Sequence, residues 1–156
     1  MAWTDSRILR SYTLDKLNET VQLPFSDTWK MALFNNTVVP DKDASSANSR
    51  YGTPATFTTG NEITDATNWP AGGKTITGLA ATAPSAGVVM IDCNDVASGG
   101  NVTLTGFFGA LEYDDTVTTP VADQAMAFNY FGGTQTVTAN PFTAVIDING
   151  LARYSH

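Results

Sequence analysis

The second half of the chain constrains the fold most strongly, because it is a succession of short strand-like runs separated by turn residues. The runs are rich in β-branched and aromatic residues, and Asp-Asp, Thr-Thr-Pro, Gly-Gly and Asn-Pro sequences lie between them. This spacing is typical of all-β sandwiches and barrels. The four runs are residues 107–113, 125–130, 134–138 and 142–148.

Further strands are expected upstream, and residues 74–151 as a whole should form the main β region. Residues 80–87 are interpreted as a loop. Asn149-Gly150 is a strong hairpin signal, which predicts a short final strand over residues 151–154. The upstream segments with strand character are residues 28–34, which alternate between a buried and a wetter face, 74–79, 88–92 and 101–105.

The first part of the chain predicts one helix and one long loop. Apolar residues recur at helical spacing over residues 4–21, and Thr4 or Asp5 can cap the first turn. We therefore assign residues 1–22 to an N-terminal helix or arm. Residues 40–60 are rich in Ser, Asp, Asn, Gly and Pro, which predicts a long surface loop of a length that is usually functional or disordered.

The length of 156 residues corresponds to a single domain, 1–156, which can bury enough surface to fold without a disulfide or a metal. We predict a mainly β fold: an antiparallel β-sandwich or jelly-roll-like domain with one N-terminal α-helix. The chain has 23 threonines and only 15% charged residues, so hydroxyl groups must supply much of its polar surface. Such a surface suits close packing against other proteins.

The charge balance and the hydropathy pattern argue against several classes of partner. The net charge is −7, so the phosphate backbone of nucleic acids would be repelled. No apolar run approaches the roughly 20 residues of a membrane span, and the N-terminus lacks the apolar core of a signal peptide. We expect synthesis in the cytoplasm and neither a nucleic-acid nor a membrane partner.

The sequence offers little that could perform chemistry. With one cysteine, Cys93, and one histidine, His156, neither a disulfide nor a Cys/His metal cluster can form, and we expect no cofactor. Pairs of aspartates at 41/43, 92/95 and 114/115 are interpreted as turn residues, because Asp readily bonds its own backbone. We predict no enzymatic activity. A glycosidase or esterase that uses Asp92 and Asp95 is the least favoured alternative.

Four stretches share a recognisable pattern: WKMALFNNTVVPDKDASSA (29–47), GNEITDATNWPAGGKTITG (60–78), GALEYDD (109–115) and AFNYFGGTQTVTANPFTAVIDINGL (127–151). Together they resemble small structural proteins of tailed bacteriophages. In that family an N-terminal helix leads to a strand ending in Asn-Asn, then to a Trp followed by Gly-Gly, and then to a final Phe-Gly-Gly segment. The chain departs from the family at residues 152–156, which are polar where the family has an apolar last strand.

The resemblance implies a virion protein without catalytic residues. We expect a capsid decoration (cement) protein that binds the assembled lattice of the major capsid protein, as a homo-oligomer and most simply a trimer, on the capsid surface. The alternative is a minor tail or tail-fibre component that contacts the host surface, for example a glycan through Trp69. The candidate interface residues, chosen from the basic N-terminal segment and the loop aromatics, are Trp3, Arg7, Arg10, Tyr51, Phe57 and Trp69.

Overall fold

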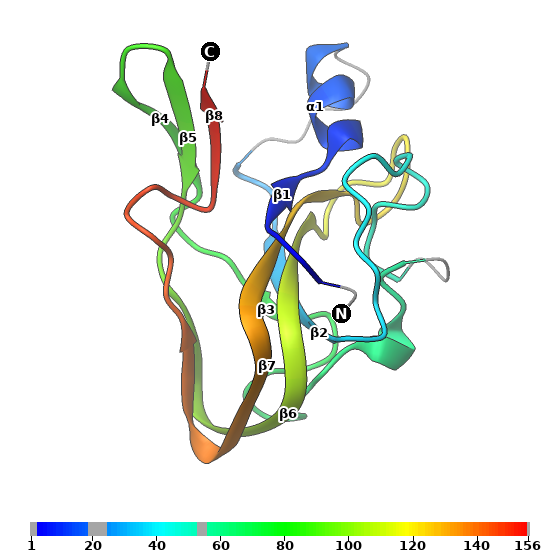
Figure 1. The fold of residues 1–156 in the computed structure, drawn as a ribbon, viewed down its shortest axis with the longest axis vertical. Coiled ribbons are helices and arrows are strands. Elements are labelled where there is room, and N and C mark those ends of the chain that lie inside the picture. Colours follow the sequence, from blue (N-terminus) through cyan, green and yellow to red (C-terminus); the bar gives the residue numbers. More distant parts are fainter. Residues whose placement is uncertain (1–2, 19–24, 53–55, 156) are drawn as a thin grey trace.

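The computed structural model describes residues 3–18, 25–52 and 56–155, and all structural statements concern these residues. They form two antiparallel sheets with one α-helix near the N-terminus (Figure 1). The predicted mainly β, sandwich-like architecture with an N-terminal helix is confirmed. The elements are β1 (Arg7–Ile8), α1 (Arg10–Leu17), β2 (Trp29–Asn35), a 3₁₀ turn (Thr59–Asn61), β3 (Lys74–Thr75), β4 (Ala80–Ser85), β5 (Val88–Asp92), β6 (Val96–Asp114), β7 (Ala125–Ala144) and β8 (Ala152–Ser155).

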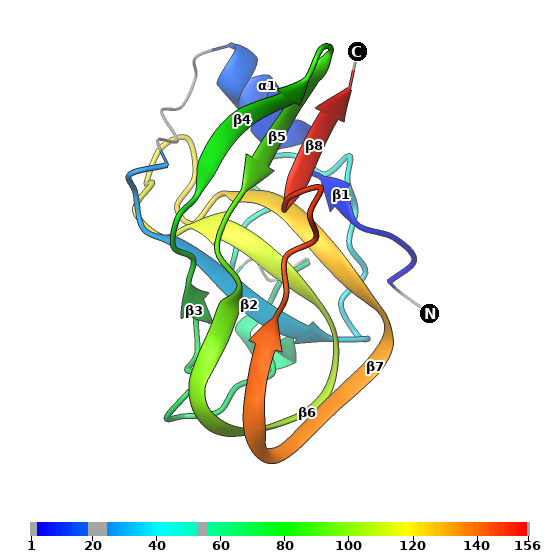
Figure 2. The same cartoon turned by 90° about the vertical axis from the view of Figure 1, so that its left-hand side faces the viewer.

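One long hairpin, β6–β7, ties the two layers together. The first sheet has the strand order β1-β7-β6-β2-β3, and the second has the order β4-β5-β8. Figure 2 shows the hairpin bending at the bottom of the molecule, so that its outer ends continue toward β5 and β8. Register shifts interrupt the pairing along the hairpin, and Gly106 has a φ of +77° there. Such a backbone is accessible to glycine without a Cβ clash, so the ribbon can turn without ending.

Strand runs that the sequence separates are therefore continuous in the structure. The Gly132-Gly133 and Asn140-Pro141 signals, expected to be turns between strands, lie inside β7. Gly132-Gly133 fall within a register shift against β6, whereas Asn140-Pro141 are paired with β6 between two such shifts. A bulge and a turn have the same glycine-rich signature, because both need unusual backbone angles. The last predicted run also ends early, since β7 stops at Ala144.

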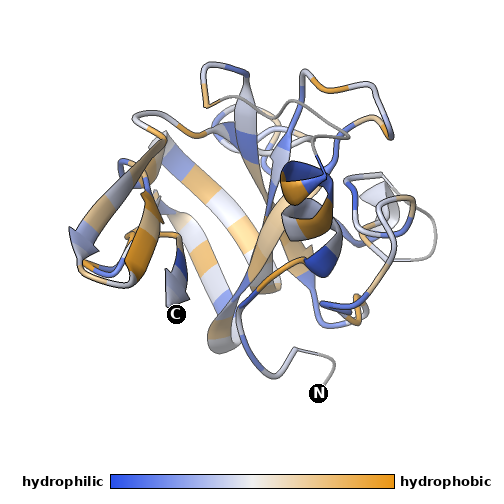
Figure 3. Ribbon diagram, turned by 90° about the horizontal axis from the view of Figure 1, so that it is seen from above, coloured by the Kyte–Doolittle hydropathy of each residue, from blue (hydrophilic) through white to orange (hydrophobic). Residues whose placement is uncertain are grey.

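β2 is buried on both faces, whereas the sequence predicts one wetter face. Met31, Ala32, Leu33 and Phe34 are at most 2% exposed. One face of β2 looks toward the second sheet, and aromatic residues from the N-terminal segment and the 40–60 loop cover the other: Phe34 packs on Phe57 with ring centroids 5.3 Å apart. The alternation of hydropathy along the strands is visible in Figure 3.

The N-terminal helix is shorter than predicted. It begins at Arg10 and ends at Leu17, and Leu9 occupies the N-cap without a side-chain hydrogen bond, so neither Thr4 nor Asp5 is the cap. The reason is tertiary: Arg7 and Ile8 pair with Phe128 and Ala127 of β7 and are extended. Residues 1–2 and 19–22 of the predicted arm, and residues 53–55 of the predicted loop, lie outside the described residues.

The second sheet contains one strand that the sequence did not predict and one predicted strand whose partner is unexpected. Residues 80–87, predicted as a loop, contain β4, an exposed edge strand in which Pro84 is tolerated. Residues 152–155 form the expected final strand, but it pairs with β5 and not back across Asn149-Gly150. In the segment 74–79 only Lys74 and Thr75 are strand.

Candidate interaction site

Three of the six predicted interface residues are core residues. Trp3, Phe57 and Trp69 have 0% exposed surface. The Trp3 ring meets Phe57 edge-on at 6.3 Å, and its indole N–H donates to the carbonyl oxygen of Asn35 at 3.1 Å. Trp69 packs on Phe142 with centroids 5.2 Å apart. The prediction that these three residues form an exposed contact surface is wrong. Each carries a large aromatic surface, and burying it in the core stabilises the fold.

Tyr51 fastens the 40–60 loop to the body of the protein. Its ring stacks on Tyr113 with centroids 4.7 Å apart, and its hydroxyl donates to Oε2 of Glu62 at 2.7 Å. Oε1 of the same carboxylate accepts the N–H of Gly72 at 2.9 Å. Burial raises the pKa of Glu62, while these two hydrogen bonds lower it in part. The loop is therefore packed onto the body at Tyr51 and Phe57.

Arg7 and Arg10 are the predicted interface residues that stay exposed. Arg7 Nη2 lies 2.8 Å from Oδ2 of Asp5, an ion pair open to solvent. Arg10 begins α1, and its backbone N–H donates to the carbonyl oxygen of Lys42 at 2.8 Å. Both arginines are thus exposed near the start of the chain: Arg7 lies on β1 beside Asp5, and Arg10 begins α1 next to the start of the 40–60 loop.

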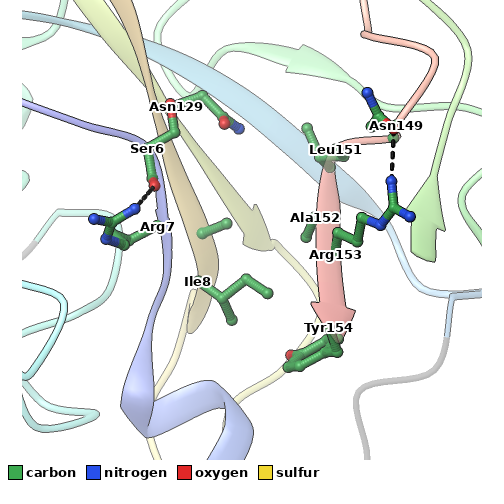
Figure 4. Close-up of a pocket in the computed structure, with 11 residues that line it drawn as sticks. Ser6, Arg7, Ile8, Asn129, Asn149, Leu151, Ala152, Arg153 and Tyr154 are labelled. Carbon is green, nitrogen blue, oxygen red and sulfur yellow. Dashed lines mark hydrogen bonds between the residues drawn. The ribbon is translucent and has the colours of Figure 1, made fainter. Parts of the chain in front are cut away.

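A cavity of about 550 Å³ separates β1 from β8. Figure 4 shows β1 along one side and β8 along the other, with Ile8 projecting into the gap. Arg7 and Arg153 point away from the gap, and Nη1 of Arg153 donates to Oδ1 of Asn149 at 2.6 Å. The lining residues are Ser6, Arg7, Ile8, Ala127, Asn129 and residues 149–154. No sequence signal identifies this site, because it needs two strand edges nearly 150 positions apart.

An apolar groove of about 360 Å³ lies on the same end of the molecule, between α1 and the second sheet. Leu17 is 76% exposed and Val89 is 41% exposed at its margin. Tyr12 is buried at its base, and desolvation raises the pKa of this phenol. The groove adds exposed apolar surface to the end of the molecule that carries Arg10.

One member of each aspartate pair accepts a nearby backbone N–H, as predicted. Oδ1 of Asp41 accepts the N–H of Asp43 at 2.9 Å, and Oδ1 of Asp92 accepts the N–H of Cys93 at 2.9 Å. Oδ1 of Asp114 accepts the N–H of Thr116 at 2.8 Å. These three contacts are the local hydrogen bonds that favour Asp in turns. The second members are held differently: Asp95 accepts the N–H of Ile146 at 2.8 Å, Asp115 pairs with Lys30 at 2.8 Å, and Asp43 pairs with Lys42.

Glu112 and Cys93 both have raised pKa values. Glu112 is 0% exposed, and within the described part of the chain neither of its carboxylate oxygens has a hydrogen-bond partner. Burial raises its pKa to about 8, and the nearby Asn129 side chain lowers it only in part. Burial also raises the pKa of the Cys93 thiol to about 12, with Glu112 adding to the effect. Both pKa values lie above 7, and a thiol that keeps its proton is a poor nucleophile.

Metal and membrane signals are absent from the residues that the structure covers. In residues 3–18, 25–52 and 56–155, no three His, Cys, Asp or Glu side chains are grouped to hold a metal ion. Among the helices described, none has the length and apolar character that crossing a bilayer requires.

Comparison with known proteins adds no relative. No protein family matches the chain, and neither a curated protein nor a solved structure matches it. Function must therefore be argued from the residues and their geometry.

Proposed function

We propose that this protein is a non-enzymatic structural component of a tailed-phage particle and that it decorates the assembled capsid lattice, as a homo-oligomer that is most simply a trimer. The proposal starts from the resemblance of four stretches of the chain to that family. One observation carries it further: stretches that are far apart in the sequence meet in the folded protein. The four stretches that resemble the family therefore belong to one folded unit.

The contact is closest around β2 and the Gly72-Gly73 corner. A Cβ on Gly73 would lie 2.0 Å from the carbonyl oxygen of Met31, so only glycine allows this approach. The hydroxyl of Tyr113 donates to the carbonyl oxygen of Gly72 at 2.8 Å. Met31, Gly72-Gly73 and Tyr113 come from three of the four resembling stretches. Their punctuation residues thus serve the fold, which supports a role that depends on shape and surface.

The state of the interior ionisable groups supports a role without chemistry. A reactive cysteine needs a lowered pKa and a base, whereas the pKa of Cys93 is raised to about 12. Glu112 is buried beneath the sheet surface and has no exposed oxygen with which to reach a substrate.

The shell contact in this proposal is the basic edge formed by Arg7 and Arg10. Removing residues 2–12 would not test it cleanly, because the deletion also removes Trp3 from the core and β1 from its sheet. The double variant Arg7→Glu/Arg10→Glu keeps both. The matched control is Arg50→Glu/Lys74→Glu, which makes the same change in net charge on other elements.

The experiment adds purified protein to intact heads and to isolated tails that lack it, and counts bound copies. Saturable binding to heads, in a multiple of a lattice number, is the expected result, and it should stabilise the shell by mass action. We expect the Arg7/Arg10 variant to lower occupancy and the control to leave it unchanged. Binding to tails alone, at a few copies, would move the protein to the tail. Binding to neither would overturn the proposal.

The host-surface alternative is not supported through Trp69. Its indole is fully buried against Phe142, so no sugar can stack on it without unfolding the corner.

A further inference from the structure

The cavity between β1 and β8 is bounded by two strand edges that face each other. β1 is the outermost strand of the first sheet, and β8 is the outermost strand of the second. Within the described chain each pairs along one edge only, β1 with β7 and β8 with β5. Figures 1 and 4 show that the two strands run in the same direction on either side of the gap. The gap is thus an opening in the wall of the sandwich.

Unpaired strand edges determine what kind of ligand would fit. Such an edge presents a row of backbone N–H and C=O groups, which is a template for another strand. Because β1 and β8 are parallel to each other, one extended segment running the opposite way would be antiparallel to both. The four residues of β8 correspond to about 13 Å of such a strand. An extended peptide would therefore use both edges, whereas a compact ligand would leave one of them unpaired.

The side chains at the two edges determine the composition of that segment. Ile8 and Ala152 are directed to the interior, where Ala152 is 7% exposed, and they leave room for small apolar side chains. Arg7 and Arg153 lie on the outer surface, one on each side of the gap. Since side chains alternate along a strand, an inserted segment would place every second residue inside and the others between the two arginines. Acidic residues suit those outer positions.

We propose that the gap between β1 and β8 binds an extended segment of another protein by strand addition, with apolar residues alternating with acidic ones and with the segment antiparallel to both edges. The proposal does not depend on the particle in which the protein works. Two of the eight basic residues of the chain flank this one gap: Arg7, which pairs with Asp5, and Arg153, which bonds the uncharged side chain of Asn149 and so leaves a positive charge beside the gap. Charge complementarity therefore selects an acidic partner here, although the protein as a whole is acidic.

The test uses the full chain, labelled with ¹⁵N, and a synthetic probe, acetyl-Thr-Val-Glu-Val-Glu-Val-Thr-amide. We expect saturable binding below about 1 mM, with amide shifts concentrated at residues 6–8 and 151–155. A probe with proline in place of the central valine loses a backbone donor and should bind at least about tenfold more weakly. A probe with lysine in place of both glutamates should also bind more weakly, because its positive charges would lie beside Arg153.

Reversing a charge on the protein sharpens the result. Arg153→Glu should weaken the glutamate probe at least about threefold and strengthen the lysine probe, since an exposed pair contributes up to about 1 kcal/mol. Lys74→Glu, on β3 at the opposite edge of the first sheet, makes the same charge change and should alter neither probe. Arg153 is an exposed residue, so the fold should tolerate its replacement.

Several results would overturn the proposal. They are absence of saturable binding, equal binding of the proline probe, and amide shifts confined to the apolar groove beside α1. Dimerisation in sedimentation equilibrium that is abolished by Arg153→Glu would show that the gap holds a second copy of this chain and not a different protein.

Discussion

Replacing Glu112 with glutamine should stabilise the protein relative to wild type, and this advantage should grow as the pH rises. The wild-type carboxyl is fully buried, and within the described residues neither oxygen has a hydrogen-bond partner. Because burial penalises the charged form, the folded state holds this group neutral to a higher pH than the unfolded chain does. Glutamine has nearly the same shape and carries no charge at any pH, so it removes only the titration.

The magnitude follows from the two pKa values of Glu112. The pKa is about 8 in the folded protein and 4.5 ordinarily, a difference that corresponds to about 5 kcal/mol at 1.36 kcal/mol per pH unit. Because the folded pKa is raised, the folded protein is most stable with respect to this group below about pH 4.5. The free energy of unfolding then falls as the pH rises and levels off above about pH 8. By pH 7 the loss should be about 3 kcal/mol, a large part of a typical domain's 5–15 kcal/mol.

The assay is urea unfolding of wild type and Glu112→Gln at intervals from pH 5 to pH 9. The difference between the two proteins isolates Glu112, because Glu62 and Asp114, whose pKa values are also raised, contribute equally to both. The advantage of the variant should grow by about 3 kcal/mol between pH 5 and pH 8. Asp43→Asn makes the same carboxyl-to-amide change at an exposed site, and its stability difference from wild type should not grow over this pH range. A difference that is constant with pH would refute the reasoning.

Three further predictions concern the core. Trp69→Ala should lose about 3–5 kcal/mol of unfolding free energy in urea titrations, as expected for a buried aromatic, and an unchanged midpoint would contradict its burial. Gly73→Ala should prevent stable folding, seen as loss of a cooperative melting transition, because its Cβ would lie 2.0 Å from the Met31 carbonyl oxygen at a φ of +79°; Gly60→Ala, with 3.9 Å to its nearest neighbour, should melt like wild type. Cys93 should react with a thiol reagent at pH 8 far more slowly in the folded protein than in urea, since its folded pKa is about 12; equal rates would show that the thiol is open to solvent.

The fold class and several strands are accessible from the sequence because they depend on short-range pattern. Alternation over residues 28–34 predicts β2, and the apolar run 88–92 predicts β5; both strands are observed within one residue. The aspartates at 41, 92 and 114 are predicted to bond nearby backbone, and they do. Turn chemistry of this kind is local and needs no knowledge of the rest of the chain.

The candidate site was not accessible in the same way. Trp3, Phe57 and Trp69 are residue types that are common at interfaces. An aromatic residue in a polar segment gives the same sequence signal whether its side chain is exposed or buried. Their burial depends on rings brought from distant segments, such as Phe34 against Phe57 and Phe142 against Trp69. Only Arg7 and Arg10, whose charge favours solvent in any fold, stayed where the sequence placed them.

The sequence by itself determined that this protein is an antiparallel β domain with a short N-terminal helix, since periodicity and turn residues act over a few positions. The tertiary structure decided which strands are neighbours. β8 follows a hairpin signal yet pairs with β5, and β1 interrupts a helical pattern because β7 offers it an edge. A period of two specifies which face of a strand is buried but not which strand lies beside it, because that depends on contacts between residues far apart in the chain.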